Sequence, residues 1–333
     1  MKCLDLFTGI GGMGRLLPVE PVMYCEKDPF CRAVLERRMR DGDLPTAPIH
    51  DDVCTLDPPD HDILIGGFPC QDISTNGLQK GFQGNRSTLF FEIIRIVKLK
   101  HPKYIFLENV RNIVNMTNVW KPVLTTIAQE GYDMKWATLG AFHCGLPQRR
   151  IRWFLYATYT GKPTTPIFNR DKIDLFGDVT NGVYHARPNP RFPEHRMEPV
   201  YMKALPGVPS RIKISEKTFV RTLWLTPRVS GGARAMNNLT RTGMRDLAGQ
   251  LRFATCTKHR HFNTNIMWVE QLMGLPANWT NPEASLDPNH VHLRMMPDKS
   301  QKKYRSRWKT LGNMCVSQCA LKAYLFLHAC PNI

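Results

Sequence analysis

The chain has 333 residues, of which 42% are hydrophobic, which suits one large globular core and a smaller second unit. It contains no run of 18 or more apolar residues and no secretory signal pattern at its start, so we expect neither a membrane span nor secretion. The formal net charge of +17 favours an acidic polymer as partner, with nucleic acid the first candidate, over a merely soluble basic protein.

The ten cysteines are scattered without a repeating spacing, which is typical of reduced thiols rather than of a disulfide framework. Cys256, His259 and His261 have the residue types of a zinc site, but their spacing matches no closed set of four ligands. We therefore predict no metal.

The N-terminal stretch predicts two strands joined by a glycine-rich turn. Residues 1–7 read as a strand, residues 8–14 as the turn, and residues 16–17 as part of a short helix. Residues 21–25 predict a second strand that ends at Glu26, about 20 residues after the first. Glycines let a ligand approach the backbone closely, and a carboxylate at this position can accept hydrogen bonds from ribose hydroxyls. Together they indicate a cofactor that contains a nucleoside.

Asp28 and Pro29 are typical of a helix start, and we expect that helix to run through Arg40. A third strand is expected to end near residues 50–53, where the carboxylate of Asp52 could bond an adenine amino group. The alternative is that these paired aspartates only cap a turn.

A cysteine follows the fourth predicted strand. The apolar residues 63–65 predict a buried strand, which two glycines and a proline end abruptly before Cys70. Cys70 then lies on a loop past the carboxyl end of the strand, the edge at which ligands bind in open α/β sheets. Residues 72–86 are polar and glycine-rich and predict a mobile lid. Cys70 is a candidate nucleophile, although its position alone fits a buried structural cysteine equally well.

Polar residues also end the fifth predicted strand. A helix is predicted over residues 87–99 and a strand over 103–107, which is followed by Glu108, Asn109 and Val110. A buried glutamate with a raised pKa could carry a proton and donate it. A satisfied structural carboxylate is the alternative.

Strands and helices alternate to about residue 158, with a helix over 118–130 and strands over 136–142 and 153–157. This pattern predicts an α/β fold with a mostly parallel sheet that helices cover on both faces. Three arginines come just before the last of these strands, and either one of them points into the site or all lie solvated on its rim. An apolar helix over 316–328 is expected to pack against the sheet.

The middle of the chain has a different composition. Residues 161–209 are rich in proline, glycine and asparagine and show no strong periodicity. From Arg211 to Arg260, eleven basic residues are opposed only by Glu216 and Asp246. Such a segment is typical of loops that grip phosphates, with a solvated charged face as the alternative.

Five short motifs stand out along the chain. They are Phe7-Thr8-Gly9-Ile10-Gly11-Gly12, Pro69-Cys70-Gln71, Glu108-Asn109-Val110, the set Gln148, Arg150 and Arg152, and Gly312-Asn313 followed by Met314-Cys315-Val316. In this order they resemble the motifs of the DNA (cytosine-5)-methyltransferase family, in its stand-alone bacterial, phage or viral form. A further match after the middle region, at residues 269–276, is partial because the arginine usually found before Leu272 is absent.

The resemblance implies a Rossmann-like methyltransferase sheet built from residues 1–165 and 305–333, with a smaller, loop-rich target-recognition domain at residues 166–304. It also implies S-adenosylmethionine as the cofactor. The residues that match the family's cofactor contacts are Phe7, Gly9, Gly11, Glu26, Asp52, Pro69, Leu89 and Asn313.

A mechanism also follows from the resemblance. The target cytosine is flipped out of duplex DNA, because its C6 atom cannot be reached in a stacked helix. Cys70 then attacks C6, Glu108 contacts N3 and the exocyclic amine, and Arg152 holds O2. The methyl group passes to C5, and the products are 5-methylcytosine and S-adenosylhomocysteine. Arg150, Gln148 and Asn109 complete the implied catalytic set.

The implied partner is double-stranded DNA, bound by a monomer in the cytoplasm of a bacterial or phage-infected cell, or in the nucleus of a eukaryote. The candidates for DNA contact lie in the lid and in the basic stretch. They are Ser74, Asn76, Gln79, Arg228, Arg234, Arg241 and Arg245.

Three alternatives stay open. A tRNA cytosine methyltransferase is one, although the Cys-Phe-Thr triplet of that branch is absent. A catalytically silent DNA-binding relative is another, but it would be expected to lose the cysteine, the glutamate or the arginines, which are all present. A thiol hydrolase would use Cys70 with His143 and would leave the glycine-rich turn and Glu26 unexplained. The sequence does not reveal the DNA site that would be recognised.

Overall fold

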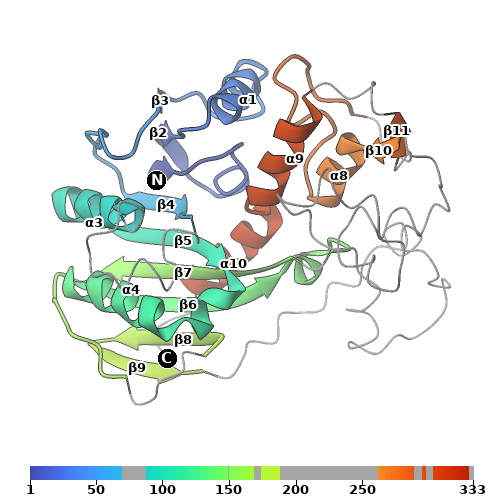
Figure 1. Cartoon of the computed structure of the whole chain (residues 1–333). Coiled ribbons are helices and arrows are strands. Elements are labelled where there is room, and N and C mark those ends of the chain that lie inside the picture. The colour runs from blue at the N-terminus through green and yellow to red at the C-terminus, as the bar shows by residue number, and fades with distance from the viewer. Residues whose placement is uncertain are drawn as a thin grey trace, which may run out of the picture.

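The computed structural model describes residues 1–69, 88–148, 150–168, 174–187, 262–288, 295–297 and 303–329. Figure 1 shows these residues as a central twisted sheet with helices packed on it. In the described residues the sheet has nine strands, in the order β3-β2-β1-β4-β5-β7-β6-β8-β9. The strands are β1 (Lys2–Leu6), β2 (Glu20–Cys25), β3 (Ile49–His50), β4 (Ile63–Gly67), β5 (Tyr104–Val110), β6 (Tyr132–Gly140), β7 (Ile151–Tyr159), β8 (Phe176–Thr180) and β9 (Val183–Ala186).

Helices cover both faces of this sheet, as the sequence predicts. The α-helices are α1 (Pro29–Arg40), α3 (Thr88–Lys100), α4 (Thr117–Gln129), α8 (Ile266–Leu272), α9 (Tyr304–Asn313) and α10 (Ser317–Ala329). The helices α1, α8, α9 and α10 share one buried cluster, and α3 and α4 share the other. Strand β1 serves both clusters, because Cys3 faces the first while Leu4 and Leu6 face the second. None of the helices in the described ranges is long and apolar enough to cross a membrane.

Strand β7 runs antiparallel between β5 and β6, whereas β3, β2, β1, β4 and β5 are parallel to one another. Only the 3-10 helix η3 (Ala141–Cys144) and a few further residues link β6 to β7. Parallel neighbours need a crossover of a dozen residues or more, so this short link returns the chain as a hairpin. The predicted α/β class is confirmed, and the sheet is mixed.

The predicted helix start at Asp28 and Pro29 is confirmed, whereas the prediction of a short helix around residues 16–17 is wrong. Helix α1 begins at Pro29, and the Asp28 carboxylate accepts hydrogen bonds from the backbone N–H groups of Phe30 and Cys31. Residues 9–16 instead form consecutive turns. Gly9 and Gly11 adopt φ values of +60° and +81°, which lie outside the right-handed helical region.

A hairpin extends the sheet where the sequence shows no periodicity. Strands β8 and β9 pair with each other, and β8 also pairs with β6. Asn181 and Gly182 form the turn with φ values of +50° and +77°. Asn-Gly is the preferred pair for such a two-residue hairpin turn, so this sequence signal was present within the proline- and glycine-rich region.

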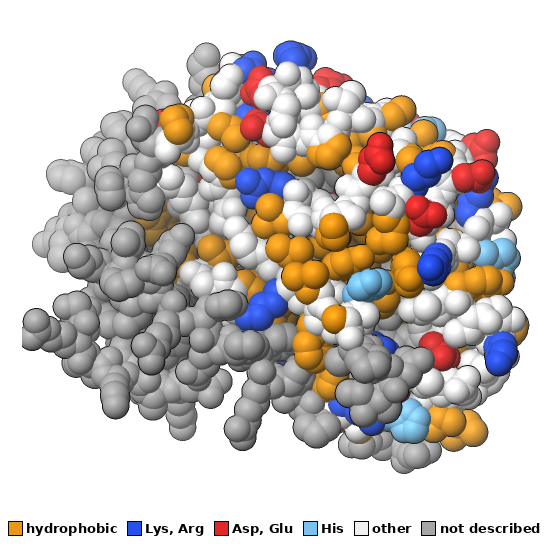
Figure 2. All heavy atoms as spheres, turned by 180° about the vertical axis from the view of Figure 1, so that it is seen from behind, with side chains coloured by type: hydrophobic (Ala, Val, Ile, Leu, Met, Phe, Trp, Pro, Cys, Tyr) orange, Lys and Arg blue, Asp and Glu red, His pale blue; other side chains and the backbone are white. Residues whose placement is uncertain are grey.

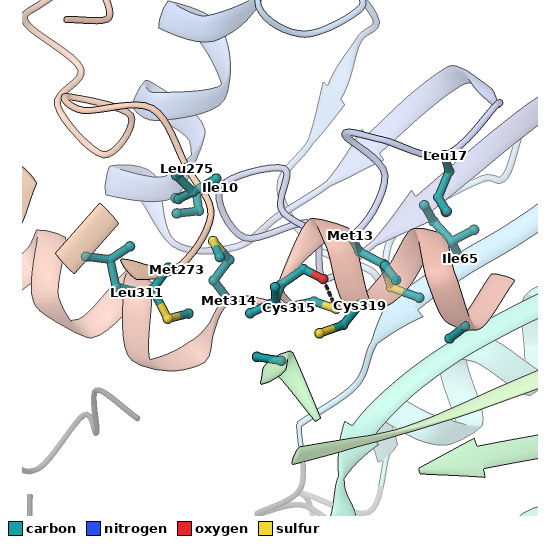
Figure 3. Close-up of a cluster of buried hydrophobic side chains, with 14 of the residues drawn as sticks. Ile10, Met13, Leu17, Ile65, Met273, Leu275, Leu311, Met314, Cys315 and Cys319 are labelled. Carbon is teal, nitrogen blue, oxygen red and sulfur yellow. Dashed lines mark hydrogen bonds between the residues drawn. The ribbon is translucent and has the colours of Figure 1, made fainter. Parts of the chain in front are cut away.

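Residues 262–288 pack on the same core as the sheet. They contribute helix α8 and strand β10 (Phe262–Thr264), which pairs antiparallel with β11 (Met295–Pro297). A buried ion pair fixes α8 to α9, since Arg307 lies 2.9 Å from the Glu270 carboxylate. Figure 3 shows side chains of this segment, including Met273 and Leu275, in one apolar cluster with Ile10 and Leu311. The boundary predicted at residues 166–304 therefore encloses pieces that pack on the main body.

Candidate active site

The parallel strands end at one edge of the sheet, and the predicted functional residues leave the strands there. Two groups of described residues gather at this edge. We name them after their predicted roles. The cofactor half contains Gly9, Glu26 and Asp52, which follow β1, β2 and β3, and the catalytic half contains Glu108, near the end of β5, and Arg152, at the start of β7.

Glu108 and Arg152 form a buried ion pair. The register of β5 and β7 pairs Glu108 with Phe154 and Val110 with Arg152, so these side chains leave one face of the sheet. Arg152 Nε lies 2.8 Å from Glu108 Oε1, and Glu108 is only 7% exposed. Burial raises the pKa of Glu108, against the opposing charges of Arg152 and Arg150. The site thus holds an oriented carboxyl group that keeps its proton to a higher pH than a free glutamate does.

Two contacts connect this carboxyl group to the segment that leads into Cys70. Gly67 pairs with Glu108 in the register of β4 and β5, and a Cβ atom on Gly67 would lie 3.0 Å from Glu108 Oε2. Asn109 Nδ2 donates a hydrogen bond to the Phe68 carbonyl, 3.1 Å away. Glu108 therefore lies beside the strand end from which the Cys70 loop leaves. The sequence signal for Gly67 was the pair of glycines that ends the strand.

Eight predicted site residues lie outside the described residues and stay predictions. They are Cys70, Ser74, Asn76, Gln79, Arg228, Arg234, Arg241 and Arg245.

Arg150 and Gln148 bond to backbone groups of distant segments. Arg150 is 1% exposed, and both of its terminal nitrogens donate to the Gly312 carbonyl at 3.2 Å. One of these nitrogens also donates to the Met314 carbonyl. Gln148 is fully buried, and its Nε2 donates to the Leu272 carbonyl at 2.8 Å. Burial lowers the pKa of Arg150, but an arginine remains charged near neutral pH. The side-chain N–H groups of Arg150 and Gln148 thus fix the backbone at Gly312, Met314 and Leu272.

The cofactor half is built around the Glu26 carboxylate. Its Oε2 accepts the backbone N–H of Gly9 and its Oε1 accepts that of Asp28, both at 2.7 Å. Burial raises the pKa of Glu26, and these hydrogen bonds oppose the increase. Each carboxylate oxygen keeps a lone pair for a further donor. Gly9 adopts φ +60°, and nothing lies within 4 Å of the Cβ position it leaves open. These features fit a nucleoside whose ribose donates to Glu26.

Asp52 already has two hydrogen-bond donors. Lys27 Nζ lies 2.9 Å from Asp52 Oδ2, and the Cys54 backbone N–H donates to Oδ1 at 3.0 Å. The hydrogen bond from Lys27 lowers the pKa of Asp52, so this carboxyl group is ionised near neutral pH. An adenine amino group would have to bind beside or displace one of these donors.

The other predicted cofactor residues occupy the same region of the fold. Phe7 directly follows β1 with φ +54°, and Pro69 follows β4 by two residues. Leu89 lies in the first turn of α3, and Asn313 is exposed at the end of α9. Their roles as contacts of a cofactor stay predictions.

Ser317 is a functional candidate that the sequence reasoning missed. Its hydroxyl, at the start of α10, donates to the Gly12 carbonyl at 2.6 Å. A Cβ atom on Gly12 would lie 2.4 Å from the Cys315 carbonyl oxygen, so only glycine fits against this segment. The available signal was a serine just before the last apolar helix.

A pocket opens beneath the glycine-rich turn. Asp5, Gly11, Arg15, Tyr24 and Ile65 are among the residues that line it. Asp5 is 2% exposed, and burial raises its pKa to about 8. Of the predicted cofactor residues only Gly11 lines this pocket, so the pocket lies to one side of the cofactor half.

No group of three or more metal-binding side chains is present among the described residues. Cys256, His259 and His261, which the sequence analysis considered, lie outside them.

The strand order, with its antiparallel β7, and the glycine-rich turn define the class of Rossmann-like methyltransferases. Solved structures share this fold. A Dnmt2 methyltransferase of S. pombe superposes with a TM-score of 0.56 and 16% identity, covering 98% of both chains. A mutant DNMT2 of Spodoptera frugiperda superposes with a TM-score of 0.54, also at 16% identity and 98% coverage of both chains.

Residues 1–285 match the model of the C-5 cytosine-specific DNA methylase family, and the chain belongs to this family. The family predicted from the five motifs is thereby confirmed.

Curated relatives are type II methyltransferases. M1.ScrFI of Lactococcus lactis subsp. cremoris is 40% identical over 186 residues, which are 53% of this chain and 44% of the relative. M.HhaI of Haemophilus parahaemolyticus is 39% identical over 160 residues, 46% of this chain and 48% of the relative. M.MspI of Moraxella sp is 29% identical over 292 residues, 84% of this chain and 64% of the relative. The chain thus spans about half the length of the first two relatives it matches.

Proposed function

We propose that this chain transfers a methyl group from S-adenosylmethionine to C5 of a cytosine in double-stranded DNA. The observation that carries the proposal is the buried Glu108–Arg152 pair, with a 2.8 Å contact, beside the strand end that leads into Cys70. A cytosine ring needs an acid at N3, a positive group at O2 and a nucleophile at C6 on the same base. A carboxyl group, a guanidinium and a thiol can supply these three functions.

In the proposed reaction the Cys70 thiolate adds to C6, which makes C5 nucleophilic. Glu108, whose pKa burial raises, protonates or hydrogen-bonds N3 and so stabilises the ring electrons released toward it. Arg152 orients Glu108 and holds O2. S-adenosylmethionine, when bound, supplies the methyl group, with Glu26 on the ribose and Asn313 near the turn. S-adenosylhomocysteine leaves, the C5 proton passes to solvent, N3 returns any proton it received to Glu108, and elimination of the Cys70 thiolate releases 5-methylcytosine.

The hydrogen bonds of Arg150, Gln148 and Asn109 indicate that these residues position other groups of the site. Arg150 fixes the backbone around Asn313, and Gln148 fixes the end of α8. Asn109 holds Phe68, two residues before Cys70. We propose that these three position the reacting groups without contacting the base.

We also propose a narrower DNA-recognition region than residues 166–304. Residues 174–187 extend the main sheet, and residues 262–288 pack on its core, which leaves 188–261 as its central part. That stretch contains 14 Lys and Arg against four Asp and Glu. In Figure 2, by contrast, basic and acidic side chains are interspersed on the described face.

Methyl transfer measured with radiolabelled S-adenosylmethionine on duplex DNA and on tRNA tests the proposal directly. We expect incorporation into DNA only, and covalent trapping on DNA that contains 5-fluorocytosine, because fluorine cannot leave as a proton. The variant Cys70→Ser should bind DNA but transfer essentially no methyl group. Incorporation into tRNA alone would replace the proposal by the tRNA enzyme.

The thiol-hydrolase alternative has little support. Burial lowers the pKa of His143 to about 4, and its Nδ1 accepts the backbone N–H of Gly140 at 3.1 Å. That nitrogen is therefore not available as a base for a thiol.

The basic stretch has its own test. If the arginines grip phosphates, DNA affinity should fall with salt at a log–log slope of roughly −0.9 per contact. The combined variant of Arg228, Arg234, Arg241 and Arg245 to glutamine should flatten this slope. Unchanged affinity, slope and target choice would exclude these four residues from DNA binding. Light scattering should give a monomer.

A further inference from the structure

A buried tryptophan far along the chain bonds the middle of the glycine-rich turn. Trp279 is fully buried, and its indole N–H donates a 2.9 Å hydrogen bond to the Ile10 carbonyl, 269 residues away in the sequence. Ile10 lies between Gly9 and Gly11, the two residues of the turn with positive φ. A backbone with two glycines has many conformations, so an external contact at its middle peptide selects among them.

The side chain of Ile10 is held by the same segment. Figure 3 shows Ile10 next to Leu275, in the buried cluster that also contains Met273 and Leu311. Residues 273–279 therefore hold both the carbonyl and the side chain of Ile10. The opposite side of the turn is held by Glu26, which accepts the N–H of Gly9 at 2.7 Å. The turn is thus clamped between the proposed ribose-binding carboxylate and Trp279.

Trp279 itself is fixed by charged groups. The Glu270 carboxylate accepts the backbone N–H groups of both its neighbours, Asn278 at 2.7 Å and Thr280 at 2.8 Å. Glu270 is fully buried and pairs with Arg307. The indole ring also lies beneath Arg15, whose guanidinium carbon is 4.8 Å from the ring centre.

A second buried arginine ties this loop to α1. Arg38 donates to the carbonyls of Asn281, at 2.9 Å, and Ala284, at 2.5 Å, and is itself fully buried. The loop that carries Trp279 is therefore held on both sides, which gives the indole N–H a defined direction toward Ile10.

We propose that Trp279 is a positioning residue for the cofactor: it sets the glycine-rich turn in the conformation that S-adenosylmethionine binds. The inference rests on the proposed function for the identity of the cofactor. In this proposal Trp279 acts without contacting the cofactor or the base. Its effect passes through the Ile10 carbonyl, so it should change cofactor binding far more than the rate of the bound complex.

The chain offers a matched control. Trp120, in α4, is also fully buried, but its indole nitrogen has no hydrogen-bond partner among the described residues, and it lies in the other core cluster. Trp279→Phe and Trp120→Phe thus remove the same atoms from equally buried sites. Only the first removes a contact to the turn.

The test is calorimetric affinity for S-adenosylmethionine, together with steady-state KM and kcat. We expect Trp279→Phe to weaken cofactor binding and raise KM by about tenfold with kcat within about twofold, from loss of one hydrogen bond and an unpaired carbonyl. Trp120→Phe should lower the melting temperature without changing affinity. Equal affinities for wild type and Trp279→Phe would overturn the proposal.

Two further measurements cover the remaining outcomes. If Trp279→Phe does not fold, benzothienylalanine at position 279 keeps the ring shape and removes only the N–H, and it should show the same loss of affinity. Amide hydrogen exchange of residues 7–17 without cofactor should be faster in the Trp279 variant than in the Trp120 variant. Amide exchange does not depend on the reaction. It therefore shows whether Trp279 restrains the glycine-rich turn even if the wild-type chain binds no S-adenosylmethionine and the proposed function fails. Equal exchange would overturn the clamp.

Discussion

The two halves of the site are held together in opposite ways. In the cofactor half the contacts of the carboxylates are local in sequence: Glu26 bonds Gly9 and Asp28, and Lys27 bonds Asp52, over separations of 17, 2 and 25 residues. Only the glycine-rich turn of this half also has distant partners among the described residues, Trp279 and Ser317. In the catalytic half they are distant. Arg150 reaches Gly312 and Met314 over 162 and 164 residues, and Gln148 reaches Leu272 over 124.

This difference has a physical consequence. The first fifty or so residues contain the partners of Glu26 and Asp52, whereas Arg150 and Gln148 find theirs only when the C-terminal segments are in place. Distant contacts close long loops of chain, and their loss exposes buried polar groups. Substitutions in the catalytic half should therefore reduce rate or stability strongly, and substitutions in the cofactor half should mainly change affinity.

The largest effect is expected at Glu108. Glu108→Gln keeps the shape but cannot transfer a proton to N3, so kcat should fall by roughly 10²–10⁴-fold, the usual range for loss of a general acid. Single-turnover methyl transfer with saturating cofactor and DNA measures it. The exposed Glu20→Gln is the control and should match wild type. A rate within tenfold of wild type would remove Glu108 from the chemistry.

In the catalytic half we expect Arg150 to stabilise the fold and Arg152 to act in the reaction. Arg150→Ala leaves the buried carbonyls of Gly312 and Met314 without a donor, so unfolding free energy should fall by about 4 kcal/mol, at 1–3 kcal/mol per group. Arg152 is less buried and bonds mainly to Glu108. Arg152→Ala should lose rate with a much smaller change in stability. Urea denaturation and kcat of both variants decide this. If Arg150→Ala is stable but inactive, Arg150 acts on the substrate and the division between the two residues is wrong.

The same contrast explains what the sequence could and could not predict. The Asp28-Pro29 helix start, the glycine-rich turn and the position of Glu26 after the second strand were predictable, because each has a signal in short stretches of the first thirty residues. The direction of β7 depends on the length of the β6–β7 link, and the bonds of Arg150 and Gln148 depend on carbonyls far along the chain. The β8–β9 hairpin was missed because proline and glycine dominate its surroundings and conceal the Asn181-Gly182 signal.

Asp5, which lines the pocket beneath the glycine-rich turn, should make the stability of the folded chain depend on pH. Its pKa is about 8 because burial disfavours the ionised form, against an ordinary value of 3.8. The unfolded chain releases this proton near pH 4 and the folded chain only near pH 8. The stabilisation from the retained proton is therefore full below about pH 4 and is lost as the pH rises toward 8.

Asp5→Asn should accordingly be more stable than wild type at pH 8 by about 3 kcal/mol. The full shift corresponds to roughly 1.4 kcal/mol per unit, less the cost of a buried amide. Near pH 4 the order should reverse, because the wild type then keeps its proton at no cost while the variant still bears the cost of the buried amide. Denaturant unfolding from pH 4 to 9 measures it, with the exposed Asp57→Asn as the control. Parallel pH profiles for wild type and Asp5→Asn would contradict the raised pKa.

The smallest effect, and the sharpest test of the cofactor half, is expected at Glu26. Glu26→Ala removes the proposed acceptor for the ribose hydroxyls, and calorimetry should show a loss of about 2 kcal/mol in S-adenosylmethionine affinity, within the 1.5–3 kcal/mol of a charge-assisted hydrogen bond. The exposed Glu36→Ala, in α1, should bind as wild type does.

Glu26 also holds the Gly9 N–H, so a loss of affinity alone does not separate a ribose contact from a displaced turn. A cofactor analogue without ribose hydroxyls separates them. If Glu26 bonds the ribose, the variant and the analogue lose the same interaction, and their effects on affinity should not add. Fully additive losses would mean that Glu26 acts only on the turn, and the cofactor half would then depend on the same kind of backbone clamp as Trp279.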